Sequence, residues 1–168
     1  SPGDGKNIKM KLLIAGSTGM LGSEMTQVFS KESCELFTLS RSRSVNSSRH
    51  LSVDLLGEGY LEEISKIKPD IVIYCAADTS ISNCEKNPIT TERLHAVCPG
   101  EISRVCKKIV YISTDSVFNG NDAPYAESDP TSPINLYAKS KLLGEKFVKK
   151  NSLDYIIVRT NMYGIGSS

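Results

Sequence analysis

The sequence predicts an α/β fold in which helices cover both faces of a doubly wound parallel sheet. Short apolar runs alternate with segments of helical periodicity along the chain, which is typical of this class. The runs are continuously apolar rather than alternating, as in strands that are buried on both faces. A glycine-rich turn follows directly after the first run, at the edge where parallel α/β proteins place a ligand.

Each element follows from its local pattern. Strands are expected where apolar residues form short runs, and helices where apolar residues recur every three or four positions. Pro69 ends one helix, and Pro99-Gly100 predicts a break or kink in another. Residues 118–133 carry three prolines and predict a long loop, which in a compact domain is usually functional. The expected strands are residues 10–15, 35–39, 71–75, 109–113 and 155–159, and the expected helices are residues 20–31, 60–68, 88–107 and 135–150.

Composition and charge argue against several classes of protein. A net charge of +1 provides no basic field, so we expect neither nucleic acid nor a membrane surface as partner. No apolar stretch reaches the roughly 18 residues of a membrane span, and no signal peptide precedes the first strand. The five cysteines form no CxxC pair, which argues against a disulfide framework and a zinc site. We therefore expect no metal and a cytoplasmic location.

Residues 16–22, Gly-Ser-Thr-Gly-Met-Leu-Gly, have the GxxGxxG spacing of a dinucleotide-binding turn. Glycines permit the tight turn, let phosphates approach the backbone and allow the helix to pack closely on the strand. The N-terminus of the following helix adds free N–H groups and a partial positive charge. This turn predicts a Rossmann fold that binds a nicotinamide dinucleotide, although an ordinary glycine-rich turn gives the same pattern.

The residues after the second strand indicate which dinucleotide binds. A carboxylate there binds the ribose 2′-hydroxyl of NAD, whereas an arginine accepts the 2′-phosphate of NADP. The sequence has Ser40-Arg41-Ser42-Arg43 and no carboxylate, so Arg41 is the candidate phosphate ligand, with Ser40 and Arg43 beside it. We therefore expect NADP, with NAD and a merely solvated basic loop as the alternatives.

Tyr137 and Lys141 lie four residues apart and share one face of a predicted helix. A nearby ammonium and the charge of an oxidised nicotinamide favour the phenolate, which brings a phenol of pKa about 10 toward the working range. Thr114 comes directly after the strand 109–113, so its hydroxyl can polarise a substrate carbonyl at the ligand-binding edge. The YxxxK spacing alone mostly indicates an exposed helix. Thr114 at the ligand-binding edge makes a catalytic interpretation more plausible.

Five segments together make the chain recognisable: residues 16–22 (GSTGMLG), 76–78 (AAD), 111–120 (YISTDSVFNG), 124–133 (PYAESDPTSP) and 137–145 (YAKSKLLGE). In this order they resemble the extended short-chain dehydrogenase/reductase superfamily, and more narrowly its dTDP-4-dehydrorhamnose reductase branch. The resemblance runs from about Lys9 to Gly164. It implies an oxidoreductase that reduces a 4-keto nucleotide sugar with NAD(P)H, as in dTDP-rhamnose biosynthesis.

The resemblance also implies a role for individual residues. Thr114 would be the catalytic hydroxyl, Tyr137 the proton donor and Lys141 its partner. Asp54 would lie by the adenine, and residues 76–77 along the cofactor. The implied cofactor-binding residues are Gly16, Thr18, Gly19, Met20, Leu21, Gly22, Ser40, Arg41, Asp54, Leu55, Ala76, Ala77, Tyr137 and Lys141.

The resemblance bears on domain organisation as well. Residues 1–8 are expected to be a tag or disordered terminus, and residues 9–168 an NAD(P)-binding Rossmann domain. Family members continue into a smaller C-terminal region that grips the sugar nucleotide. The chain is therefore expected to be truncated before that region and to turn over substrate poorly. A homodimer is a possible oligomeric state, which the sequence does not decide.

Two positions depart from the family pattern. Ser116 stands where relatives usually carry a tyrosine near the substrate. His95 stands where an asparagine normally supports the catalytic lysine, and a partly exposed helix residue is the alternative interpretation. Neither change removes the set formed by Thr114, Tyr137 and Lys141.

Reduction is the preferred function, with Tyr137 protonating the ketone oxygen while hydride reaches the carbon. Epimerisation and dehydration begin with a related hydride step, but dehydration needs a further acid–base pair that Asp115 and Ser116 do not clearly supply. The chain is also similar to the beta subunit of methionine adenosyltransferase, which has the same scaffold. A non-catalytic regulatory subunit is therefore the second hypothesis.

Overall fold

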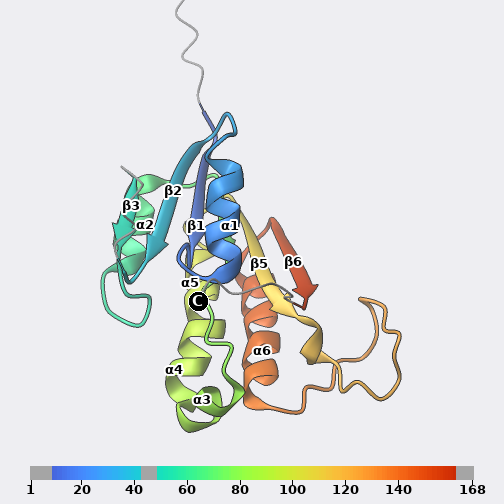
Figure 1. Cartoon of the computed structure of the whole chain (residues 1–168). Coiled ribbons are helices and arrows are strands. Elements are labelled where there is room, and N and C mark those ends of the chain that lie inside the picture. The colour runs from blue at the N-terminus through green and yellow to red at the C-terminus, as the bar shows by residue number, and fades with distance from the viewer. Residues whose placement is uncertain (1–8, 43–48, 162–168) are drawn as a thin grey trace, which may run out of the picture.

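Figure 1 shows the computed structural model of the chain, which describes residues 9–42 and 49–161. Six strands form one parallel sheet in the order β3-β2-β1-β4-β5-β6, which is the strand order of the Rossmann fold. The predicted fold class is confirmed. The elements are β1 (Lys11–Ala15), α1 (Met20–Phe29), β2 (Glu35–Ser40), β3 (His50–Ser52), α2 (Tyr60–Ile67), β4 (Ile71–Tyr74), α3 (Ile81–Lys86), α4 (Pro88–Glu92), η1 (Arg93–Val97), α5 (Cys98–Ile102), β5 (Lys108–Thr114), η2 (Asp115–Val117), α6 (Leu136–Asn151) and β6 (Tyr155–Thr160).

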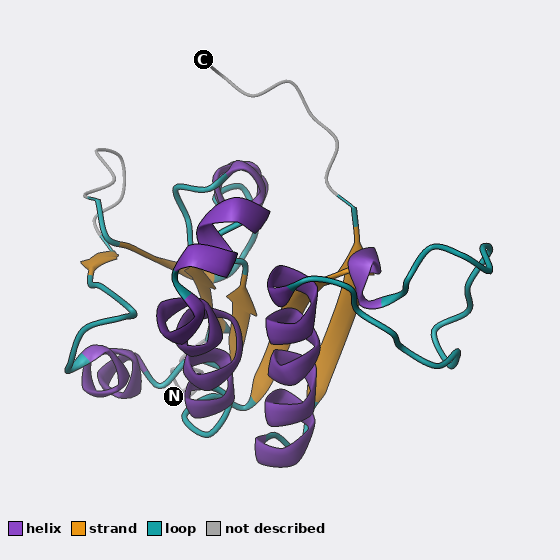
Figure 2. Ribbon diagram, turned by 90° about the horizontal axis from the view of Figure 1, so that it is seen from below, coloured by secondary structure: helices purple, strands orange, loops and turns teal. Residues whose placement is uncertain are grey.

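Alternate residues of the strands contribute to two cores on opposite faces of the sheet. Leu13 and Tyr74 belong to the larger core, which α2, α5 and α6 cover. Leu12 and Ile73 belong to the smaller core, against which α1 packs. Figure 2 shows the helices packed along the strands and the loop after β5 extending away from the sheet. The period of two along buried parallel strands thus places helices on both faces, as predicted.

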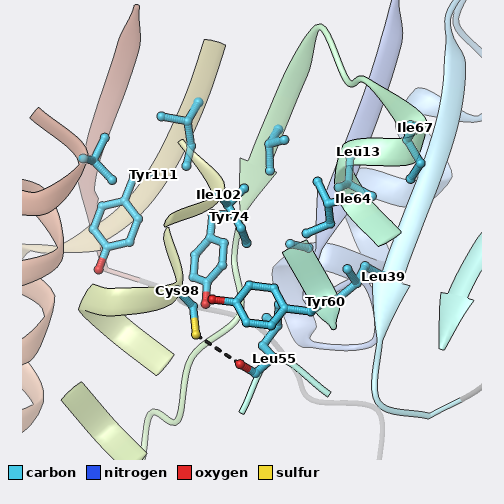
Figure 3. Packing of buried hydrophobic residues seen from close by; sticks show 14 residues of the cluster. Leu13, Leu39, Leu55, Tyr60, Ile64, Ile67, Tyr74, Cys98, Ile102 and Tyr111 are labelled. Carbon is cyan, nitrogen blue, oxygen red and sulfur yellow. Dashed lines mark hydrogen bonds between the residues drawn. The ribbon is translucent and has the colours of Figure 1, made fainter. Parts of the chain in front are cut away.

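The larger core contains polar atoms that are paired within it. Figure 3 shows the side chains of Tyr60, Tyr74 and Cys98 meeting between the sheet and its helices. The Cys98 thiol donates to the Leu55 carbonyl oxygen at 3.1 Å, and the Tyr60 hydroxyl donates to the Glu101 carboxylate. Buried polar groups need such partners because an unpaired one is costly.

The helical stretch before β5 contains a π-helical turn, η1. Pro99 supplies the reason, because proline has no N–H to donate to the carbonyl four residues earlier, which is that of His95. The Cys98 N–H instead donates to the Arg93 carbonyl, in the wider π pattern. The break expected at Pro99-Gly100 therefore occurs one turn earlier, and Pro99 stands in the first turn of α5.

Tyrosines of two central strands satisfy the carbonyls of this π turn. The Tyr74 hydroxyl donates to the Leu94 carbonyl at 2.7 Å, and the Tyr111 hydroxyl donates to the His95 carbonyl at 2.6 Å. The two buried rings are stacked, with their centroids 6.1 Å apart. The π turn is thereby fastened to β4 and β5.

Helix α6 lies against the same turn because Gly144 has no side chain. A Cβ atom at Gly144 would overlap the His95 carbonyl oxygen and the Tyr111 hydroxyl. This close approach places the N-terminal part of α6, which carries Tyr137, next to η1.

Several elements differ from the sequence prediction; the helix predicted for residues 88–107 ends at Ile102, and η2 is not predicted. The strand β3 is not predicted, because three residues are too few for a periodic signal and its pairing with β2 forms it. The short helix α3 is also not predicted; Ser80 caps it by accepting a hydrogen bond from the Asn83 N–H at 3.2 Å. The expectations for residues 1–8 and for the C-terminal end fall outside the described residues.

Replacing Gly144 by alanine tests the contact between α6 and η1. Alanine normally stabilises a helix interior by about 1 kcal/mol relative to glycine. Here we expect Gly144→Ala to lower the free energy of unfolding by about 1–3 kcal/mol, because the added methyl group overlaps fixed atoms. Urea unfolding measures it, with Lys146→Ala on the exposed side of α6 as control. A Gly144→Ala variant at least as stable as the parent would contradict this packing.

Candidate functional site

The glycine turn joins β1 to α1 at the carboxyl edge of the sheet. Gly16 has a φ of 89°, and its N–H donates to the Leu39 carbonyl at 2.8 Å. A Cβ atom there would lie 2.6 Å from the backbone nitrogen of Ala76, so only glycine fits. Gly22 is buried in α1 against the turn, and a Cβ atom there would overlap the Gly16 carbonyl oxygen.

The first turn of α1 has the properties of an anion site. Gly19 precedes the helix without a side-chain cap, and the first turn has no acidic residue. No side-chain cap and no first-turn carboxylate therefore competes for the free N–H groups of Met20, Leu21 and Gly22. Such an end suits a phosphate group.

A cavity of about 610 Å³ lies beside this turn. It lies beyond the ends of β1 and β4, where the strand order reverses and Rossmann proteins bind their ligands. Nine of the predicted cofactor residues line it: Gly16, Thr18, Gly19, Ser40, Arg41, Asp54, Leu55, Ala76 and Ala77. The remaining predicted residues, Met20, Leu21, Gly22, Thr114, Tyr137 and Lys141, are not among those that line it.

Sequence reasoning missed one wall of this cavity. The wall comes from the loop after β4 and from α3 and α4, and it includes Thr79, Asn83, Asn87, Thr90, Thr91 and Leu94. The four-residue spacing of the two asparagines is the available signal, since it places two amides on one side of a turn. The sequence prediction begins a helix at residue 88 and has no helix over α3, so Asn83 had no predicted element to belong to.

The end of the cavity at β2 carries the predicted phosphate ligand. The Arg41 side chain is exposed, and Ser40 donates to the Ser42 carbonyl at 2.5 Å. The Asp54 carboxylate already accepts the Leu56 N–H at 2.9 Å. An exposed guanidinium here fits a 2′-phosphate. Arg43, the predicted helper, lies outside the described residues.

Thr114 and Tyr137 come together at the end of β5. The Thr114 hydroxyl is buried, accepts the Ser116 N–H at 3.1 Å and donates to the Asp115 carboxylate at 3.3 Å. Burial raises the pKa of the Tyr137 phenol above its ordinary value, and a hydrogen bond with Thr114 opposes this. Since a hydrogen bond joins the Thr114 and Tyr137 side chains, the two hydroxyls lie close enough to face one reacting oxygen.

Lys141 lies on the same side of α6 but reaches into the protein. Its side chain is 2% exposed, and Nζ donates to the Ile112 carbonyl at 2.5 Å and lies 4.4 Å from the centre of the Tyr111 ring. Burial lowers the pKa of Lys141 to about 7. The Tyr137 pKa is raised rather than lowered as the spacing predicted, because burial outweighs the hydrogen bond with Thr114. The Lys141 ammonium is bonded to the Ile112 carbonyl instead.

His95 is fully buried, so the interpretation as a partly exposed helix residue is wrong. Its ring meets that of Tyr137 edge to face, with the centroids 5.6 Å apart. Burial, with a smaller effect of the Lys141 charge, lowers the pKa of His95 to about 3. The imidazole is therefore neutral near neutral pH.

A second cavity of about 600 Å³ lies outside η2, against the loop after β5. Phe118 and Tyr125 stack in this loop, with the ring centroids 4.5 Å apart. Arg159 holds the loop, because it lies over the Phe118 ring, donates to the Glu127 carbonyl at 3.1 Å and forms a 2.7 Å ion pair with the buried Glu145. Ser116, the residue that departs from the family pattern, lines this cavity.

The described residues form no metal centre, no disulfide and no membrane-spanning helix. No group of three or more metal-ligating side chains occurs there. All five cysteines are free thiols. No helix between residues 9 and 161 that the structure describes is long and apolar enough to cross a membrane.

Fold and site together define an α/β Rossmann protein with a ligand cavity at the switch point of its sheet. The family model described as "RmlD substrate binding domain" matches residues 10–166. This chain belongs to that family.

The curated relatives include both dTDP-4-dehydrorhamnose reductases and methionine adenosyltransferase beta subunits. The chain is 32% identical over 157 residues to dTDP-4-dehydrorhamnose reductase of Shigella flexneri, covering 90% of this chain and 51% of that one. It is also 32% identical over 154 residues to methionine adenosyltransferase 2 subunit beta of Rattus norvegicus, covering 89% of this chain and 46% of that one. The chain thus spans about half the length of the curated relatives it matches.

Among solved structures, the chain resembles dTDP-4-dehydrorhamnose reductase from Bacillus anthracis in complex with NADP. The TM-score is 0.77 at 28% identity, covering 90% of this chain and 53% of that one.

The buried ammonium of Lys141 makes a prediction about pH. Its folded-state pKa of about 7 lies below the ordinary 10.5, so the unfolded chain binds more protons between these values and stability rises with pH there. Relative to Lys141→Met, the parent should gain at most about 1.4 kcal/mol per pH unit across this interval. Unfolding from pH 7 to 9 measures the difference.

Lys146→Met, on the exposed side of α6, corrects for the loss of a positive charge. Parallel stability curves for the parent and Lys141→Met would contradict a depressed lysine pKa.

Proposed function

We propose that this chain is the cofactor-binding half of an NADP(H)-dependent reductase that acts on a 4-keto nucleotide sugar. The observation that carries the proposal is the cavity lined by the glycine turn, Arg41 and residues 76–77. Similarity to dTDP-4-dehydrorhamnose reductases, one of them in complex with NADP, supports the same conclusion. The proposal places the chain among the short-chain dehydrogenases/reductases.

The residues present fit this cofactor. The uncapped first turn of α1 would hold the pyrophosphate, and the missing side chain of Gly16 leaves the backbone accessible. Arg41 would bind the 2′-phosphate, and Asp54 and Leu55 would lie along the adenine and its ribose. When bound, NADPH supplies the hydride for the ketone carbon.

The catalytic roles rest on the two hydroxyls at the end of β5. Thr114 would hydrogen-bond the ketone oxygen and polarise it. Tyr137 would give its proton to that oxygen, and its raised pKa keeps the phenol protonated until then. Lys141 would rotate its side chain away from the Ile112 carbonyl, and its ammonium would then stabilise the Tyr137 phenolate. The product is the alcohol.

Residues 9–168 form the NAD(P)-binding domain in this proposal. A further region that grips the sugar nucleotide would complete the active site in the whole protein. The second cavity, beside Phe118 and Arg159, is also lined by Ser116 and Asn135, which are close in sequence to Thr114 and Tyr137, and would be where such a substrate binds.

A regulatory subunit is the second candidate function. The methionine adenosyltransferase beta subunits are as similar to this chain as the reductases are. The Lys141 ammonium is bonded to the Ile112 carbonyl, an arrangement that a non-catalytic protein can keep. A regulatory subunit on this scaffold could keep the cofactor cavity, so turnover rather than cofactor binding distinguishes the two candidates.

The preference for NADPH is tested at Arg41. We expect Arg41→Ala to weaken NADPH binding about tenfold, since a charge-assisted contact to the 2′-phosphate is lost, and to leave NADH binding unchanged. Fluorescence titration measures both. Arg104→Ala serves as control, because Arg104 is bonded to Asn151 and does not line the cavity. Equal weakening for NADH and NADPH would argue against a 2′-phosphate contact.

Catalysis is tested at Tyr137 in a protein that includes the whole native reading frame. With NADPH and a dTDP-4-keto-6-deoxy sugar, Tyr137→Phe should lower turnover by at least about 100-fold and leave NADPH affinity unchanged. Absorbance of the reduced cofactor follows the reaction. Tight NADPH binding without turnover of keto sugars by the parent protein would favour the regulatory subunit instead.

A further inference from the structure

The buried imidazole of His95 lies between the two halves of the site. Its Nε2 accepts a hydrogen bond from the Asp78 backbone N–H at 3.0 Å, so Nε2 carries no proton. Its Nδ1 therefore carries the proton and donates to the Ser140 hydroxyl at 2.8 Å. The Ser140 hydroxyl in turn donates to the Tyr137 carbonyl at 2.8 Å. Three hydrogen bonds thus run in one direction from Asp78 to Tyr137.

Each end of this chain of bonds belongs to a different part of the site. Asp78 lines the cofactor cavity and ends the segment that begins with Ala76. Tyr137 stands in the first turn of α6 and places its ring against the imidazole. A single neutral ring therefore fixes the distance between the cavity wall and the tyrosine.

The surroundings of His95 hold the ring in this orientation. The Tyr111 hydroxyl donates to its carbonyl at 2.6 Å, and the π turn sets the direction of its side chain. Near neutral pH the imidazole stays uncharged, because burial and the nearby Lys141 disfavour the cation. A charged ring would donate from both nitrogens and would lose the bond from Asp78.

We propose that His95 is a positioning residue that aligns the cofactor-binding loop after β4 with Tyr137. The inference rests on the proposed function, because alignment matters where a cofactor and a proton donor must meet one substrate. A residue that only fills the core would not need hydrogen bonds to both Asp78 and Ser140, as His95 has.

Two variants separate the two bonds of the ring. Asparagine places an amide nitrogen near the position of Nδ1 and can still donate to Ser140, but it does not reach Asp78. Glutamine places an amide oxygen near Nε2 and can still accept from Asp78, but it loses the bond to Ser140. His95→Asn and His95→Gln remove the same ring, so they serve as controls for each other.

We expect a crossed result from these variants. His95→Asn should speed exchange of the Asp78 amide hydrogen and weaken NADPH binding about fivefold, as expected for the loss of one buried hydrogen bond. His95→Gln should keep both properties near those of the parent and instead shift the carbonyl carbon resonance of Tyr137. Ser140→Ala should reproduce the second effect, with Ser103→Ala, a buried serine bonded to Gly100, as its control.

The outcomes separate this inference from the proposed function. If both His95 variants change the same properties together, or the parent ring carries its proton on Nε2 by NMR, the positioning role is overturned. If the parent protein does not bind NADPH, the proposed function fails, while amide exchange and the carbonyl resonance still test the alignment.

Discussion

The contact of the Tyr111 hydroxyl with the His95 carbonyl, beneath Gly144, fastens β5, η1 and α6 to one another. The carbonyl is available because Pro99 has no N–H to offer it. The hydroxyl comes from a central strand, and the missing side chain at Gly144 lets α6 approach both. One proline, one tyrosine and one glycine on three elements therefore fix where α6 begins relative to the sheet.

The buried polar groups near Tyr137 are either uncharged, easily discharged or paired with an opposite charge. The imidazole of His95 is neutral, and the low pKa of Lys141 makes its ammonium easy to discharge. The buried carboxylate of Glu145 is paired with Arg159 and also accepts from the Ser113 hydroxyl at 2.6 Å. In the proposed function these groups surround the proton donor Tyr137, whereas the exposed Arg41 lines the cavity beside the glycine turn. A dTDP-4-dehydrorhamnose reductase and a methionine adenosyltransferase beta subunit can share this scaffold, since the cavity beside the glycine turn is not lined by Tyr137.

The sequence was most informative where the pattern was local. The apolar strands and the glycine turn predicted the sheet and the position of its cavity, because buried parallel strands and phosphate-binding turns need those residues at adjacent positions. The direction of the Lys141 ammonium was not predictable from its spacing to Tyr137, since its acceptor, the Ile112 carbonyl, lies on another element. The alignment through His95 likewise depends on a π turn, whose cause is Pro99 and whose partners lie far away in the sequence. The cavity wall was missed because α3 is too short to show a helical period, while the residues of α4, which fall in the helix predicted for residues 88–107, carry no motif that points to a ligand.

The most direct test of the account is to map NADPH onto the backbone amides by NMR. The account predicts the largest shifts at residues 16–22, at Arg41 and at residues 76–78, with little change beside Phe118 and Tyr125. Shifts that gather around Phe118 and Tyr125 instead, or the absence of shifts at the glycine turn with saturating NADPH, would contradict it.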